Sequence, residues 1–278
     1  MSLLNKKIFL LDMDGTIYLD NRLFDFTLPF LSYITEIGAK YIFMTNNSSK
    51  STEQYLKKLA DMNIPATSAQ LITSTHATAM HLKNQYGNQL IYASGTSAFV
   101  KELSESGLNI ISSLDTAISS KEIALPIAAL VMCFDTELTF QKLENLCILL
   151  NKGVDYIATN PDVTCPKEYG YVPDCGSIAQ ILKNATGREP LFIGKPMTTM
   201  PEMALKRSGF SKAEALIIGD RLYTDIACGI NVGIDTALVL SGESTLADLD
   251  AGPIKPTYVY RDLGQLQQIM ENKCEEFN

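Results

Sequence analysis

Several residue types are scarce in this 278-residue sequence, and each shortage argues against a class of protein. There is no tryptophan, there are two histidines, and the six cysteines show no CxxC spacing. Neither a disulfide framework nor a zinc module is therefore predicted, and we expect reduced thiols. The N-terminal apolar run, 8–11, is short and ends in acidic residues, which argues against a signal peptide or a membrane span. We expect a cytoplasmic protein that does not enter membranes.

Basic residues are also in short supply, with 23 Lys and Arg against 31 Asp and Glu, for a net charge of −8. A surface that tracks nucleic-acid phosphates needs clustered lysine and arginine, so we expect no nucleic-acid partner. An anionic substrate would be repelled by this charge unless a metal ion, a lysine or a helix N-terminus supplied local positive charge.

Short β-rich runs alternate with longer amphipathic stretches, which is typical of a parallel sheet covered by helices. The strands expected in a first sheet are 7–11, 40–45, 191–193, 215–218 and 237–240, and the expected helices are 28–37, 52–62 and 224–231. The middle of the chain repeats the pattern, with strands near 89–93, 128–133 and 155–158. We predict an α/β protein whose discontinuous core domain, 1–79 and 182–278, carries an inserted lid domain, 80–181.

The sequence Asp12-Met13-Asp14-Gly15-Thr16 directly follows the first expected strand. Two neighbouring carboxylates at a strand end need a cation or a shared proton, and Mg²⁺ would supply the cation. One carboxylate could attack phosphorus while the second donates a proton to the leaving oxygen and then activates water. The alternative is an ordinary aspartate-rich turn.

Three further segments place polar residues where expected strands end. Thr45-Asn46-Asn47-Ser48-Ser49 could cradle a phosphate at a helix start, or could simply cap that helix. Lys195, in Gly194-Lys195-Pro196, could balance phosphate charge, or could be solvated. Asp220 and Asp225 could complete an oxygen-rich Mg²⁺ shell, or could form a turn and a helix cap.

Together, in order and spacing, these four segments resemble the four motifs of the haloacid dehalogenase superfamily. The run Gly219-Asp220-Arg221-Leu222-Tyr223-Thr224-Asp225 resembles its NagD-like, p-nitrophenylphosphatase subfamily. The resemblance covers nearly the whole chain. It implies a Rossmann-like, doubly wound parallel sheet with an inserted α/β cap domain of the C2 type. It also implies a Mg²⁺-dependent phosphatase of small phosphate esters, such as sugar phosphates, nucleotides, pyridoxal phosphate or p-nitrophenyl phosphate.

The resemblance also implies a role for each matching residue. Asp12 would be the nucleophile that becomes an aspartyl phosphate, and Asp14 the general acid and base. Thr45, Asn46 and Lys195 would hold the phosphate. Mg²⁺ would be bound by Asp12, the backbone carbonyl of Asp14 and Asp220, with Asp225 supporting that shell. Relatives commonly form dimers through their caps, so a homodimer is an expectation from resemblance.

Substrate choice is expected to lie in the cap, where the sequence is less informative. Thr159-Asn160-Pro161-Asp162 resembles a cap loop that faces the active site, which makes Asn160 and Asp162 candidates for substrate contact; a plain turn is the alternative. Asp174 and Cys175 depart from a Pro-Gly-Ala-Gly segment common in relatives. From charge sign alone, the added acid would disfavour multiply charged phosphates.

Two other functional classes fit the same motifs. A phosphotransferase or phosphomutase would use the same Asp12 chemistry but pass the phosphate to a second alcohol. A sensor of phosphorylated metabolites would bind without turnover, which the intact acid at Asp14 disfavours.

Overall fold

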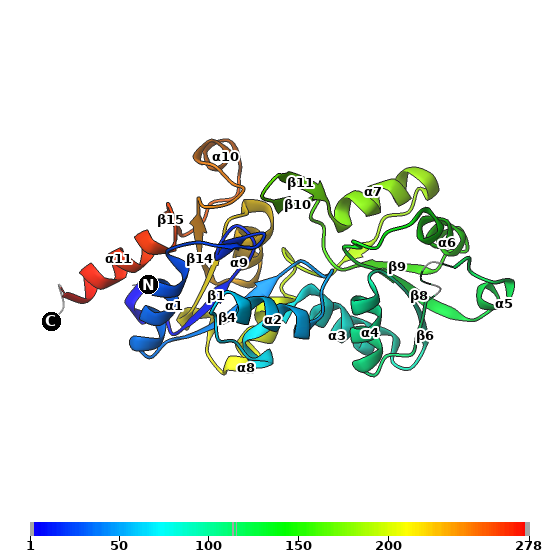
Figure 1. Ribbon diagram of the computed structural model, residues 1–278, viewed down its shortest axis with the longest axis horizontal. Coiled ribbons are helices and arrows are strands. Elements are labelled where there is room, and N and C mark those ends of the chain that lie inside the picture. The colour runs from blue at the N-terminus through cyan, green and yellow to red at the C-terminus, as the bar shows by residue number, and fades with distance from the viewer. Residues whose placement is uncertain (1–2, 113, 115, 276–278) are drawn as a thin grey trace.

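The computed structural model describes residues 3–112, 114 and 116–275, which form two lobes lying end to end (Figure 1). The described part of the chain begins and ends on the lobe of the first sheet (Figure 1). The first sheet has the strand order β15 (Tyr258–Tyr260), β14 (Asp235–Val239), β13 (Ala215–Gly219), β1 (Ile8–Leu11), β4 (Lys40–Thr45) and β5 (Leu71–Thr73). Its paired strands are parallel, as predicted for a core of this fold class.

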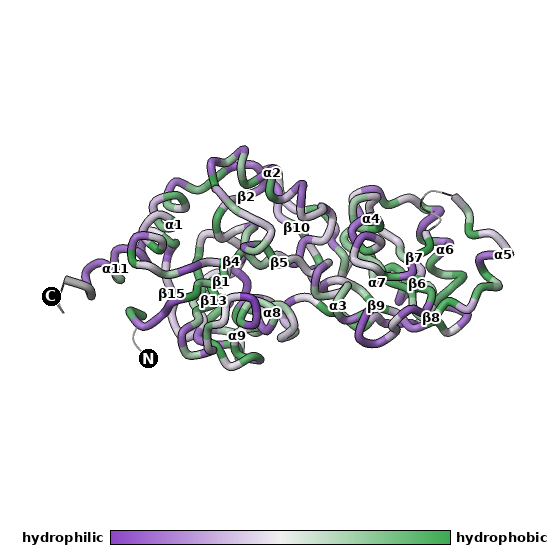
Figure 2. Tube along the Cα trace, turned by 90° about the horizontal axis from the view of Figure 1, so that it is seen from below, coloured by the Kyte–Doolittle hydropathy of each residue, from purple (hydrophilic) through white to green (hydrophobic). Residues whose placement is uncertain are grey.

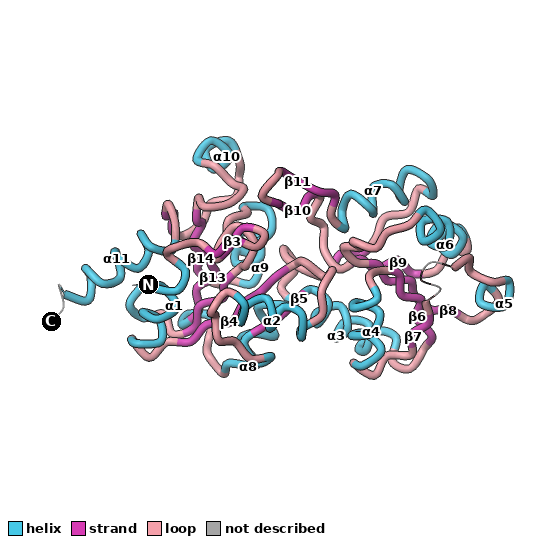
Figure 3. Tube along the Cα trace, in the orientation of Figure 1, coloured by secondary structure: helices cyan, strands magenta, loops and turns pink. Residues whose placement is uncertain are grey.

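The second lobe is built on a smaller parallel sheet. Its strand order is β12 (Leu191–Phe192), β9 (Asp155–Ala158), β8 (Ile127–Met132), β6 (Leu90–Ser94) and β7 (Ile110–Ile111). Two antiparallel hairpins lie outside the sheets: β2 (Tyr18–Leu19) with β3 (Arg22–Leu23), and β10 (Thr164–Lys167) with β11 (Gly170–Pro173). The β10–β11 hairpin reaches from the second lobe towards the first (Figure 3).

Helices connect the strands, as the crossovers of parallel sheets require. They are α1 (Thr27–Glu36), α2 (Thr52–Asp61), α3 (Ser74–Tyr86), α4 (Ser97–Glu105), α5 (Ser120–Ile123), α6 (Phe140–Asn151), α7 (Cys175–Thr186), α8 (Thr199–Ser208), α9 (Ala227–Val232), α10 (Leu246–Ala251) and α11 (Leu263–Glu275). Hydrophilic and hydrophobic residues alternate along them (Figure 2), and no helix in the described part of the chain is long and apolar enough to cross a membrane.

Both faces of the first sheet are covered, because every residue of β1 is buried and alternate side chains point to opposite faces. Phe9 and Leu11 belong to a hydrophobic cluster with residues of α1, α2 and α11. Ile8 and Leu10 belong to a second cluster, with residues of α3, α8 and α9. The fold is therefore doubly wound.

That second cluster does not stop at the end of the first sheet. It also contains Ile91 and Val131, from β6 and β8 of the other sheet. The two lobes thus share one continuous apolar core, which explains why no polar or glycine-rich linker marks a joint in the sequence.

Most predicted elements match the structure to within two residues. The assignment of 191–193 to the first sheet is wrong, because β12 pairs with β9 of the second sheet through Leu191 and Ile157. A short apolar run does not show which strand it will pair with. The boundaries at 80 and 182 stay a prediction. Because α7 and β12 both pack in the second lobe, we propose that the chain returns to the core after Phe192.

Candidate active site

The carboxyl ends of three adjacent strands bring the predicted motifs together. Leu11 of β1 lies beside Ile218 of β13 and Phe43 of β4, so the residues that follow emerge at one edge of the sheet. Ligands of open α/β sheets bind at this edge. A small cavity of about 30 Å³ lies here, lined by Asp12, Asp14, Thr45, Asn46, Asn47, Asp162, Cys165, Pro166, Asp174, Lys195, Arg221, Thr224 and Asp225.

Lys195 is the cation at the centre of this site. Its side chain is 2% exposed, and its Nζ donates to Asp12 Oδ1 at 2.5 Å, to Asp225 Oδ1 at 2.6 Å and to the Met44 carbonyl at 3.0 Å. Burial alone would lower the pKa of Lys195, but the two carboxylates raise it well above its usual range. The ammonium therefore stays charged and fixes the direction of the Asp12 carboxylate.

Three buried carboxylates gather at this site, and two of them, Asp12 and Asp225, pair with the ammonium of Lys195. Asp12, Asp220 and Asp225 each place an oxygen within 4.8 Å of the others. Burial, and then repulsion by Asp225, raises the pKa of Asp220 to about 7, and the same two causes raise the pKa of Asp12 well above its usual value. The site therefore has a deficit of positive charge.

Asp220 shows where a cation would fit. Its Oδ2 accepts a hydrogen bond from the Glu243 N–H at 2.7 Å, whereas its Oδ1 is buried without a hydrogen-bond partner. The backbone passes close by: a Cβ on Gly15, which has a φ of +88°, would lie 2.4 Å from Asp220 Oδ2. Asp225 differs, because its two oxygens already accept from Lys195 and from the Arg221 N–H. The donors left for a metal are thus Asp220 Oδ1 and Asp12 Oδ2, whose hydrogen bond from the Thr16 hydroxyl is long at 3.5 Å; carboxylate oxygens suit Mg²⁺.

Asp14 lies at the rim of the cavity and is partly exposed. Burial raises the pKa of its carboxyl, and the largest opposing influences are the ammonium groups of Lys58, Lys167 and Lys50. A carboxyl whose pKa is raised holds a proton more readily at neutral pH, as a general acid requires.

Thr45 and Asn46 are both buried against the cavity, but their surroundings differ. Thr45 Oγ1 accepts the Asn47 N–H at 3.1 Å, and the Thr45 hydroxyl also hydrogen-bonds with Tyr55. The Asn46 side chain donates to Asp162 Oδ2 at 2.6 Å and to the Lys195 carbonyl at 2.9 Å, and it accepts from the Lys195 N–H at 2.8 Å. Asn46 therefore ties the cap loop to the lysine loop, and its role in holding phosphate stays a prediction.

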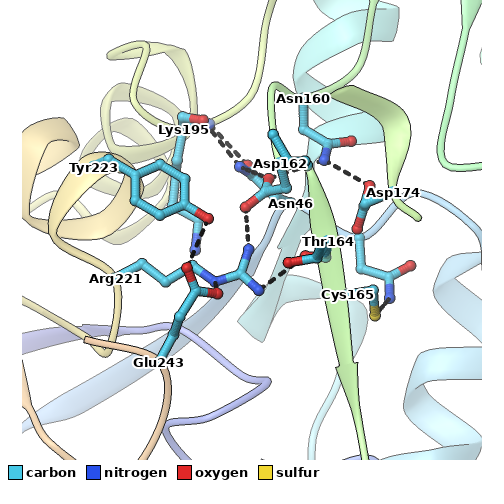
Figure 4. A network of polar contacts seen from close by, with 12 residues as sticks. Asn46, Asn160, Asp162, Thr164, Cys165, Asp174, Lys195, Arg221, Tyr223 and Glu243 are labelled. Carbon is cyan, nitrogen blue, oxygen red and sulfur yellow. Dashed lines mark hydrogen bonds and ion pairs between the residues drawn. The ribbon is translucent and has the colours of Figure 1, made fainter. Parts of the chain in front are cut away.

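Arg221 is a site residue that the sequence did not single out. It is 8% exposed, and its guanidinium forms ion pairs with Asp162 and Glu243 and donates to the Thr164 carbonyl at 3.1 Å. Figure 4 shows Asp162 lying between Asn46 and Arg221. Arg221, which follows a strand of the first sheet, thus binds two residues of the second lobe, Asp162 and Thr164. Its signals in the sequence were its position directly after a predicted metal ligand and its place in the run 219–225 that resembles the NagD-like subfamily.

The two cap candidates are placed differently. Asp162 lines the cavity, whereas Asn160 is fully buried behind it. The Asn160 amide donates to Asp162 Oδ2 at 2.9 Å and to Asp174 Oδ1 at 3.0 Å, and its oxygen accepts from Thr159 Oγ1. These contacts make Asn160 a support for two acids, and substrate contact by either residue stays a prediction.

The raised pKa of Asp174 predicts how the stability of the protein depends on pH. Burial, and then repulsion by Asp162, raises its pKa to about 7. Because this value exceeds that of an unfolded aspartate, the group's stabilising contribution is complete below about pH 4 and is lost as the pH rises through 7. We expect Asp174→Asn to gain about 2–3 kcal/mol of stability relative to wild type between pH 5 and pH 8. Urea denaturation at both pH values measures this, and an unchanged difference would contradict it.

Comparison with known proteins agrees with this geometry. Residues 9–109 match the family described as haloacid dehalogenase-like hydrolase, and residues 192–266 match a second family described as HAD-hydrolase-like. An acid sugar phosphatase of Staphylococcus aureus is 36% identical over 93% of this chain and 96% of its own length.

Solved structures give the same result. A 4-nitrophenylphosphatase of Thermotoga maritima is 36% identical, with a TM-score of 0.86 over 97% of this chain and all of its own. A glycerol phosphate phosphatase of Mycobacterium tuberculosis, solved in complex with magnesium, is 27% identical, with a TM-score of 0.85 over 96% of this chain and 79% of its own. The chain belongs to the haloacid dehalogenase-like hydrolases and is a phosphatase of their NagD-like group.

Proposed function

We propose that this protein is a Mg²⁺-dependent phosphatase that hydrolyses small phosphate monoesters through a phosphorylated Asp12. The observation that carries the proposal is the buried group of Asp12, Asp220 and Asp225, in which Asp12 and Asp225 pair with the Nζ of Lys195. The relatives are named as phosphatases of sugar, nitrophenyl and glycerol phosphates, which supports this substrate class.

The reaction needs two steps from two carboxylates. In the first, an Asp12 oxygen attacks phosphorus, the bond from phosphorus to the ester oxygen breaks, and that oxygen takes the proton of the Asp14 carboxyl. In the second, Asp14 removes a proton from water, the water oxygen attacks phosphorus, and the bond to Asp12 breaks. Inorganic phosphate leaves and Asp12 is restored. Lys195 holds the Asp12 carboxylate in place for the attack.

Asp12 and Asp220 would bind the metal, together with the backbone carbonyl of Asp14, while Asp225 would hold Lys195 against Asp12. A bound Mg²⁺ supplies positive charge that stabilises the phosphoryl oxygens as they become more negative. The unpartnered Oδ1 of Asp220 is the donor that most clearly lacks a cation.

We expect purified protein to release phosphate and nitrophenol from p-nitrophenyl phosphate in equal amounts when Mg²⁺ is present. Treatment with EDTA should remove most of this activity, and added Mg²⁺ should restore it, because Asp12 and Asp220 are otherwise mutually repelling carboxylates. Adding glycerol distinguishes a phosphotransferase, which would release less phosphate than nitrophenol. Full activity after exhaustive removal of metal would contradict the proposal.

A further inference from the structure

A second cavity begins where the first one ends. Its volume is about 240 Å³, and it shares Asp14 and Asn47 with the first cavity. In the proposed function, Asp14 protonates the leaving oxygen, so the alcohol part of the ester must start next to the Asp14 carboxyl. The second cavity is the open space on that side, and the alcohol part of the substrate would extend into it.

The wall of this second cavity is rich in ammonium groups. It contains Lys50, Lys58 and Lys167, together with the carboxylates of Asp14 and Glu137. Asp14 lines both cavities, so these ammonium groups lie in the same cavity wall as the site of proton transfer. A cluster of this kind is unexpected in a chain of net charge −8.

The acids around this cavity form ion pairs with only some of its ammonium groups. Lys167 pairs with Asp20 at 3.1 Å, and Glu137 accepts hydrogen bonds from the Ser97 backbone and hydroxyl. Among the residues that the structure describes, neither Lys50 nor Lys58 forms an ion pair within 4.0 Å. Two ammonium groups therefore line the cavity without a paired carboxylate.

Lys58 is the more unusual of the two. Its Nζ lies 3.6 Å from the centroid of the buried Tyr18 ring, and burial lowers its pKa to about 8. Its neighbour on α2, Lys57, is 75% exposed and pairs with Asp61 at 2.8 Å. A partly desolvated ammonium with no paired anion is favourably placed to bind an anionic group on a ligand.

We propose that Lys58, with Lys50 and Lys167, binds a second anionic group on the alcohol part of the substrate, so that esters of acidic alcohols are preferred over esters of neutral ones. This inference rests on the proposed function and narrows its substrate class. The anion is a carboxylate or a second phosphate. Asp174, the acid expected to disfavour such substrates, lines the first cavity and is absent from the residues that line the second.

The test compares matched esters. 2-Phosphoglycolate is paired with 2-hydroxyethyl phosphate for the carboxylate, and 1,3-propanediol bisphosphate with 3-hydroxypropyl phosphate for the second phosphate. We expect kcat/KM of wild type to be about tenfold or more higher for the acidic member of at least one pair, a value typical of one charge-assisted hydrogen bond. The pair that shows the preference identifies the anion.

Variants connect this preference to the lysines. Lys58→Met should reduce the acidic-to-neutral ratio of kcat/KM by about tenfold, mostly through a higher KM, and Lys58→Arg should retain it. Lys57→Met, on the same helix, should leave the ratio unchanged. Equal kcat/KM within both pairs, or a preference that survives Lys50→Met combined with Lys58→Met, would overturn the inference. Hydrolysis of none of the esters, p-nitrophenyl phosphate included, would instead refute the proposed function.

Discussion

Asp12→Asn should reduce phosphate release by about four to six orders of magnitude, the loss typical when a covalent nucleophile is removed. The amide matches the carboxylate in shape but does not attack phosphorus. Folding should be retained, because Lys195 keeps its ion pair with Asp225 at 2.6 Å and one of three mutually repelling carboxylates is neutralised. Steady-state assays with p-nitrophenyl phosphate and Mg²⁺ measure the loss.

The matched control is Asp14→Asn, which should lose a smaller factor, about 10²–10⁴, because it removes proton transfer and leaves the nucleophile in place. Circular dichroism and thermal unfolding should show both variants folded. If the Asp12→Asn protein retained activity within tenfold of wild type, Asp12 would not be the nucleophile.

Lys195→Met should destabilise the metal-free protein by about 3–5 kcal/mol, the cost typical of breaking a buried ion pair. Asp12 and Asp225 would then lie buried beside Asp220 with no cation between them. Activity should also fall close to background, because nothing would hold the nucleophile. Urea denaturation measures the stability, and added Mg²⁺ should recover part of it, since the ion supplies positive charge to the same carboxylates.

Lys142→Met is the control for this effect. Lys142 is also 2% exposed and pairs with a buried acid, Asp135, at 3.0 Å, but it lies in the second lobe. We expect a comparable loss of stability without any recovery on addition of Mg²⁺. Equal recovery in both variants would show that Mg²⁺ stabilises the protein away from the carboxylates around Lys195.

The sequence predicted the convergence of Asp12, Thr45 and Asp220 because the carboxyl ends of parallel strands meet at one edge. Lys195 was predicted to join them for the same reason, but it reaches the site from a loop that follows β12 of the second sheet. Hydrophobic alternation along the sequence did not reveal the very short strands. β5 and β15 have three residues each, too few to show a period of two, and neither was predicted. β12 was placed in the wrong sheet because its pairing with β9 depends on contacts distant in sequence.

Residues whose importance comes from a neighbour could not be predicted. In the sequence, Lys58 is one of several lysines on an amphipathic helix, and only the fold places it over Tyr18 and near Asp14. Arg221 likewise gains its role from Asp162, which lies 59 positions away along the chain. Asn160, whose contact with substrate stays a prediction, donates its amide to two acids, an arrangement that no local pattern encodes.

The small size of the first cavity limits what can bind there while the protein has the conformation described above. About 30 Å³ holds roughly two water molecules, too little for a phosphate ester. Asp162 instead presents its own oxygens to Asn46 and Arg221. Asp162 thus keeps the Asn46 amide and the Arg221 guanidinium occupied and ordered in the state that the structure shows.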